Sequence, residues 1–171
     1  MSQPDKYAKN AKEWRNFAKI NYKAAATLFA SGNPFFILVA ATLGHHALEM
    51  YLKAALICSG MIVFNPAKVG SLDPGLGISA SDCAWDHALA ALAETLAAKR
   101  KDFDLSAPLG LPESEVITFP KTLIEGLKLF DPFFYELRYP QELANIDGVS
   151  EEDGMVLDKL VALIEPFANR Q

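Results

Sequence analysis

Apolar residues recur every three or four positions through most of this chain, which is the spacing of one face of an α-helix. The first such segment covers residues 6 to 31, where lysines and arginines separate the apolar positions and Gly32 ends the pattern. Asn33-Pro34 is a start signal, because Asn caps free amides and Pro tolerates the first helical position. A second helix is predicted over residues 34 to 59, apolar nearly all round in its first half, which makes it the central core helix.

The rest of the chain alternates irregular segments with helices. Residues 61 to 81 hold several prolines and glycines without a period, which predicts a long loop. A third helix is expected to start at Ser81 or Asp82 and to end at the basic triplet 99 to 101. After a second irregular connection at 104 to 120, a helical stretch with Leu123 and Phe130 ends by Pro140. Ser150 and Asp153 resemble a capping box before the last helix.

The composition supports a helical fold. Ala (25) and Leu (22) far outnumber Val (7), Ile (9) and Thr (5), so helix formers supply most of the apolar mass. At 171 residues the chain fits one domain. We therefore predict an all-α fold, a single domain over residues 1 to 171 built as an up-and-down bundle of about five helices.

Charge and cysteine content narrow the function classes. The formal net charge of -5 provides no global field for nucleic acid or anionic lipid, so any nucleic-acid contact must be local. Cys58 and Cys83 form no disulfide framework and no metal-ligand spacing. The N-terminal stretch has no apolar core of a signal peptide, and the most apolar segment is soon followed by charged residues. We expect a cytoplasmic protein without a membrane helix, whose apolar share of about 54% hints at an interface.

The densest polar cluster is GHHALEMYLKA, in which His45, Glu49 and Lys53 lie four residues apart on one stripe of the second helix. In a functional interpretation, His45 and Glu49 are metal ligands or an acid/base pair. Because the second motif residue of HExxH is missing, the pattern favours a solvated or interface stripe with ordinary side-chain pairing. His46 is expected to pack in the core or an interface, and no metal or cofactor is predicted.

Arg138 and His87 are the other candidate residues. In FFYELRYP, aromatic neighbours around Arg138 provide the rigid setting of a phosphate-binding guanidinium, and an ion pair with Glu49 or Glu136 fits the sequence equally well. His87 is either a pH-sensitive ligand or a residue that caps or packs. No GxSxG, P-loop or GxGxxG motif occurs, and Cys58 in ALICSG is expected to be an inert thiol, so we predict no covalent catalysis.

Three segments, ALEMYLKAALICSG, DHALAAL and YELRYP, resemble the HEPN domain in their order and placement. This resemblance implies a helical bundle that pairs as a homodimer. The ribonucleases among HEPN proteins carry a histidine four to six residues after the arginine, whereas Arg138 is followed by YPQELAN. The RYP ending is similar to HEPN domains associated with nucleotidyltransferases, for which nucleotide binding or a toxin–antitoxin role is suggested.

Carried over by position, the resemblance implies a polar groove. Its helix-four residues are Tyr135 and Arg138, its helix-two residues are Glu49 and Lys53 with His45 beside them, and His87 is the histidine of helix three. The leading hypothesis is a non-catalytic dimer whose groove binds a nucleotide phosphate or a partner protein. The alternatives are a metal-independent ribonuclease that uses a displaced histidine (His45, His46 or His87) and a pure dimerisation module.

Overall fold

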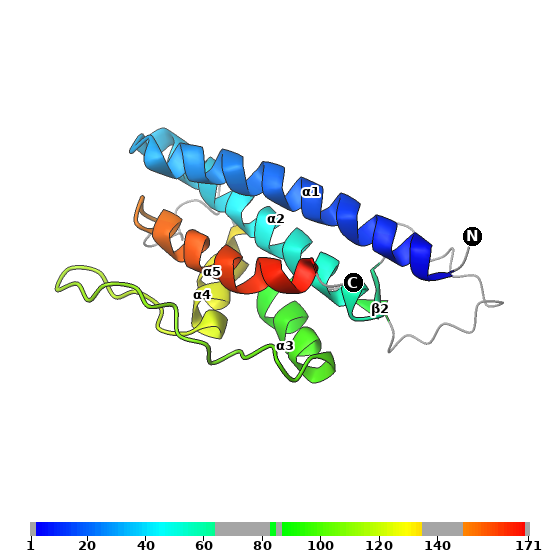
Figure 1. The fold of residues 1–171 in the computed structure, drawn as a ribbon. Coiled ribbons are helices and arrows are strands. Elements are labelled where there is room, and N and C mark those ends of the chain that lie inside the picture. The colour runs from blue at the N-terminus through cyan, green and yellow to red at the C-terminus, as the bar shows by residue number, and fades with distance from the viewer. Residues whose placement is uncertain (1–2, 64–82, 85–86, 135–148, 170–171) are drawn as a thin grey trace.

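The computed structural model describes residues 3–63, 83–84, 87–134 and 149–169, and this part of the chain is helical (Figure 1). It confirms the all-α class. The elements, in chain order, are α1 (Gln3–Ala30), α2 (Pro34–Cys58), β1 (Ile62–Val63), β2 (Cys83–Ala84), α3 (Leu89–Lys99), α4 (Leu123–Phe130), the 3-10 helix η4 (Asp131–Phe134) and α5 (Asp153–Ala168).

A tight turn joins α1 to α2 and makes them an antiparallel pair (Figure 1). Gly32 adopts a φ of +61°, which only glycine reaches without strain. The Asn33 side chain accepts a hydrogen bond from the Phe35 amide at 3.0 Å, and Pro34 occupies the first turn. The predicted end of the first helix and start of the second are therefore confirmed to within a residue.

α2 is the central helix, packed against α1, α3 and α5. Its middle and C-terminal turns are buried almost without interruption, as expected from its apolar sequence. Gly44 lets α4 and α5 approach closely, because a Cβ there would lie 2.9 Å from Phe130 Cε1 and 3.3 Å from Leu157 Cδ2. By length and composition α2 also has the features of a membrane span, although half of its most apolar window is buried inside the protein.

The predicted start of the third helix is wrong. Cys83 and Ala84 form β2, which pairs in parallel with β1, and α3 begins only at Leu89. Ala88 is extended, and the carboxylate that caps the α3 amides belongs to Asp131, far along the chain. The helix also ends at Lys99, one residue into the predicted basic triplet. Most of the predicted 61 to 81 loop lies outside the described residues, as does Trp85.

The irregular connection at 104 to 120 is confirmed, and it returns to the bundle through a bridge between Pro108 and Thr122. Thr122 then caps α4, its hydroxyl accepting from the Glu125 amide at 3.4 Å. At Asp131 the α-helix gives way to the 3-10 helix η4, which ends at Phe134. The predicted end of this helix near Pro140 falls in residues 135–148, which the structure does not describe.

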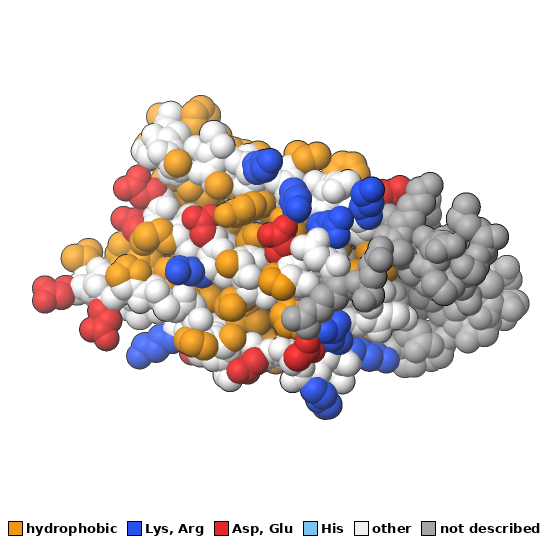
Figure 2. Space-filling model, in the orientation of Figure 1, with side chains coloured by type: hydrophobic (Ala, Val, Ile, Leu, Met, Phe, Trp, Pro, Cys, Tyr) orange, Lys and Arg blue, Asp and Glu red, His pale blue; other side chains and the backbone are white. Residues whose placement is uncertain are grey.

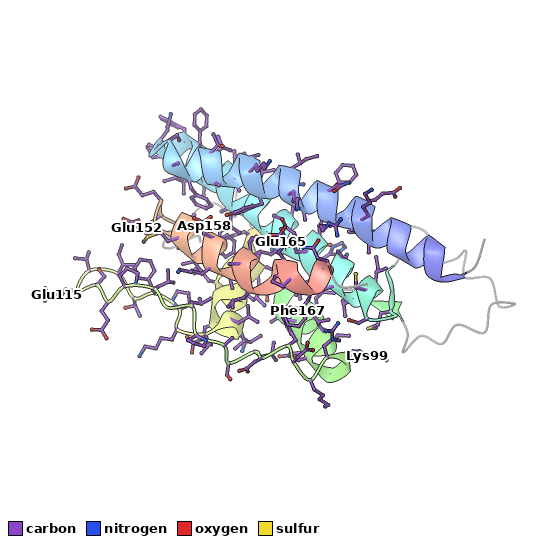
Figure 3. All side chains as sticks on the ribbon, viewed as in Figure 1. Lys99, Glu115, Glu152, Asp158, Glu165 and Phe167 are labelled. Carbon is purple, nitrogen blue, oxygen red and sulfur yellow. The ribbon has the colours of Figure 1, made fainter. Side chains whose placement is uncertain are left out.

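α5 is the predicted last helix, and it closes the bundle with an apolar face in which Val156, Leu160 and Ile164 are fully buried. Half of the predicted capping box forms: the Asp153 carboxylate accepts from the Ser150 amide at 3.0 Å. Two acidic side chains of α5, Asp158 and Glu165, point toward α1 (Figure 3). Asp158 accepts a hydrogen bond from the Tyr22 hydroxyl at 2.7 Å, and Glu165 pairs with Lys19 at 3.2 Å.

Candidate functional site

Four of the six predicted site residues lie together in the structure. His45, Glu49 and Lys53 come from successive turns of α2, and His87 comes from the non-helical residues just before α3. The other two, Tyr135 and Arg138, lie in the stretch that the structure does not describe. The site can therefore be built from α2 and the N-terminal end of α3.

Glu49 is the hub of this polar cluster. Its Oε1 atom accepts a hydrogen bond from Lys53 Nζ at 2.6 Å and faces His87 Nδ1 at 2.8 Å. Its Oε2 atom lies 3.8 Å from His45 Nε2. Because an ionised carboxylate only accepts hydrogen bonds, the Nδ1 atom of His87 carries the proton that is donated to Glu49. A single carboxylate therefore fixes a lysine and orients an imidazole.

The stripe is buried, so the expectation of a solvated or interface stripe is wrong. His45 is fully buried, Lys53 is 1% exposed and Glu49 is 6% exposed. The physical reason is that α2 lies at the centre of the bundle, so even its polar positions face other helices. The pairing expected from the four-residue spacing does form between Glu49 and Lys53, since a buried charge needs an opposite charge nearby.

Lys53 is held from two sides. Besides its ion pair with Glu49, its ammonium lies 5.4 Å from the centroid of the Trp14 ring of α1, within the range of a cation–π contact. The buried carboxylate and ammonium cancel each other's charge in the core. Lys53 therefore acts as the buried counter-ion of Glu49. The solvent-exposed end of the cluster is formed by His87.

His45 anchors the cluster to the helix α4. Its Nδ1 atom donates to the Phe130 carbonyl at 2.9 Å, which fixes the orientation of the ring. Burial lowers the pKa of His45, and this effect outweighs the Phe130 bond and the nearby Glu49 charge, which act in the opposite direction. His46 packs edge-on against it, with ring centroids 6.1 Å apart. His45 is therefore a neutral structural residue of the core.

His87 is the member of the cluster that solvent reaches. Its side chain is 30% exposed, compared with 8% for the Glu49 side chain to which it is bound. An imidazole whose Nδ1–H is bound to a carboxylate has a fixed tautomer and a fixed orientation. This arrangement presents the opposite edge of the ring in a defined direction, where it suits ligand binding or proton transfer.

Asp131 caps the helix that begins just after His87. Its carboxylate accepts from the Leu89 amide and, at 3.3 Å, from the Ala90 amide, so it caps the helix that follows His87. The preceding residue, Phe130, binds His45. The junction of α4 and η4 thus binds His45 and caps the helix that follows His87. No local signal identified this cap, because Asp131 lies 42 residues after Leu89 in the sequence.

Other chemistry finds little support among the described residues. They include no group of three or more His, Cys, Asp or Glu side chains arranged to hold a metal ion. The Cys58 thiol donates to the Ala168 carbonyl at 3.5 Å, and burial raises its pKa, which disfavours the reactive thiolate. This geometry agrees with the expected inert thiol.

Comparison with known proteins adds no assignment. No family model matches the chain, and no curated protein or solved structure is significantly similar to it.

Proposed function

We propose that this chain is a HEPN-like helical domain, non-catalytic and homodimeric, that binds a nucleotide or a partner protein through a polar groove at His87. The observation that carries the proposal is the Glu49–His87 contact of 2.8 Å. It combines a solvent-accessible imidazole with a buried, charge-compensated support. A histidine that only filled space would not require a buried carboxylate and its own buried counter-ion.

The groove is completed in this proposal by Tyr135 and Arg138 of the RYP segment. A guanidinium forms paired hydrogen bonds to phosphate oxygens, and a protonated imidazole adds a further donor. Glu49 and Lys53 contribute no net charge and serve as the support of His87. The missing histidine after Arg138 is the reason for proposing binding without catalysis. A nucleotidyltransferase or a toxin–antitoxin partner is the proposed protein ligand.

The test is the affinity of the purified protein for fluorescent adenosine nucleotides, measured by anisotropy. We expect His87→Ala and Arg138→Ala each to weaken binding at least about tenfold, the usual cost of losing a charge-assisted hydrogen bond. Lys99→Ala is the matched control, since Lys99 is an exposed cation at the opposite end of α3 (Figure 3). If both site variants bind nucleotide as the wild type does, the groove assignment is wrong.

The second candidate function is a metal-independent ribonuclease. The same Glu49–His87 pair has the geometry of a carboxylate-oriented general base, so among the three histidines His87 is favoured. His45 is disfavoured because it is fully buried. This function requires cleavage of RNA in the presence of a chelator, lost in both His87→Ala and Arg138→Ala. RNA that stays intact with the wild-type protein removes this candidate.

A further inference from the structure

The α1–α2 pair exposes a large apolar surface on the side away from α5. α1 contributes Phe17 (60% exposed) and Ile20 (64% exposed), and α2 contributes Phe36 (44% exposed) and Val39 (50% exposed). Half-buried apolar and uncharged residues continue this surface along both helices. We call it the outer face and define it by Phe17, Ile20 and Ala24 of α1 and by Phe36, Val39, Leu43, His46 and Met50 of α2.

The outer face is continuous across the two helices. Asn21 of α1 lies at their junction, where its side-chain amide contacts Met50 Sδ of α2 at 3.7 Å. Along α2 the residues of the outer face are spaced by three, four, three and four positions, the spacing of a seam that packs against another helix. The face is therefore shaped for helix-to-helix packing.

Charged side chains are absent from this part of α2. Between Phe36 and Met50 the only Asp, Glu, Lys or Arg is Glu49, which is buried in the polar cluster. Lys19 of α1 lies toward α5, where it pairs with Glu165, and Figure 2 shows basic side chains over α1 on that side. Depletion of charge is the compositional mark of the centre of a protein interface.

We propose that the outer face is the surface through which two copies of this chain associate. The inference rests on the dimer of the proposed function and names its contact surface. Because the residues of the outer face carry no charge, the face needs no opposite charge on its partner and can pack against an identical face. Twofold pairing of identical faces is the commonest form of protein assembly. The contact would be a bundle of four helices, two from each copy.

The size of the outer face agrees with this occupant. From Phe36 to Met50 it is about 21 Å long at 1.5 Å per residue, and two helices side by side make it roughly 20 Å wide. Because side chains make the two surfaces uneven, two such faces together bury on the order of 1,000 Å² of accessible surface. The expected contact is therefore close to the smallest area found for specific interfaces.

A lipid surface is a less suitable occupant. Anionic membranes attract basic residues, whereas none of the residues that define the outer face is a lysine or an arginine and Lys19 of α1 is paired with Glu165 of α5. The tip of the α1–α2 pair carries acidic neighbours instead: Glu151 Oε2 lies 3.1 Å from where a Cβ of Gly32 would be, and Glu152 follows it. These carboxylates oppose the approach of the tip to an anionic bilayer.

The experiment is the molar mass of the whole chain by light scattering after gel filtration, over loading concentrations from about 1 to about 200 µM. We expect the wild type to reach twice its 18.7 kDa. Ile20→Glu and Val39→Glu each place two like charges in the contact and should weaken it at least about a hundredfold. Both side chains are at least half exposed, so the fold should survive, as far-UV circular dichroism checks.

Val116→Glu is the matched control, because Val116 is 92% exposed on the 104 to 120 connection, away from the outer face. It should leave the dimer intact. A monomeric wild type at the highest concentration, or dimers that persist in both Glu variants, overturn the inference, as does binding of the wild type to anionic vesicles that Ile20→Glu abolishes. Nucleotide affinity is measured on the same samples. A monomer that still binds nucleotide separates failure of this surface from failure of the proposed groove.

Discussion

Glu49 and His87 are 38 residues apart in the sequence, yet their side chains meet at 2.8 Å. The contact joins the buried core of α2 to the exposed entrance of α3. Lys53 completes it from one turn further along α2, at 2.6 Å from the same carboxylate oxygen. Any ligand that touches His87 therefore acts on a residue whose position is set by the core.

Removing one partner of the buried ion pair should cost more than removing both. Glu49→Gln leaves the Lys53 ammonium buried without a counter-charge, and we expect the free energy of unfolding to fall by about 3 to 5 kcal/mol. The double variant Glu49→Leu with Lys53→Met removes both charges and should recover most of this loss. Urea unfolding of the three proteins is the measurement. Equal losses in the single and double variants would show that packing, and not charge, dominates at this position.

Asp131 should stabilise the start of α3 specifically. Because its carboxylate caps the Leu89 and Ala90 amides, we expect Asp131→Ala to lower the free energy of unfolding by about 1 to 2 kcal/mol. Asn keeps one acceptor, so Asp131→Asn should lose less. Hydrogen exchange checks the location: protection should fall at Leu89 and Ala90 and stay unchanged at the far end of α3. Uniform loss of protection across the helix contradicts the capping assignment.

Local signals in the sequence predicted the elements whose interactions are local. Asn33 caps an amide two residues away, so the dipeptide Asn33-Pro34 identified the start of α2 to the residue. The start of α3 was predicted wrongly because its cap, Asp131, comes from a different part of the chain. The sequence of residues 81 to 89 alone therefore does not show where α3 begins.

The candidate site shows the same division. The four-residue spacing of His45, Glu49 and Lys53 correctly put the three side chains on one side of α2. The spacing does not show whether that side of α2 faces solvent or the core. We predicted solvent because charged residues are mostly exposed in folded proteins. Burial of the stripe depends on the helices that cover α2. Only the assembled bundle shows that the side facing solvent is instead the apolar one, with Phe36 and Val39.

Gly44 should be intolerant of a side chain. A Cβ at this position would lie 2.9 Å from Phe130 Cε1, closer than ordinary van der Waals contact, and Phe130 is fully buried. We expect Gly44→Ala to lower the melting temperature and to cost about 1 to 3 kcal/mol, despite the higher helix propensity of Ala. Gly60→Ala offers no such crowding and tests instead the strain of a φ of +84°. If Gly44→Ala is as stable as the wild type, α2 and α4 are further apart than described.

Asp153 should make stability depend on pH in an unusual direction. Burial raises the pKa of Asp153 to about 6, and the hydrogen bond from the Ser150 amide offsets only part of that rise. The folded protein therefore binds a proton that the unfolded chain releases between about pH 4 and pH 6. This residue's contribution to the free energy of unfolding is greatest below about pH 4 and is lost as the pH rises through 6.

Asp153→Asn removes the buried charge and keeps an acceptor for Ser150, so it should stabilise the protein at pH 7.5 by about 1 to 2 kcal/mol and have little effect at pH 4. Loss of a favourable charge at the N-terminus of α5 reduces the gain but does not reverse it. The measurement is urea unfolding at both pH values. Glu151→Gln is the control, because Glu151 is an exposed carboxylate two residues earlier. A gain that is equal at pH 4 and pH 7.5 would show that the Asp153 carboxylate is not the titrating group.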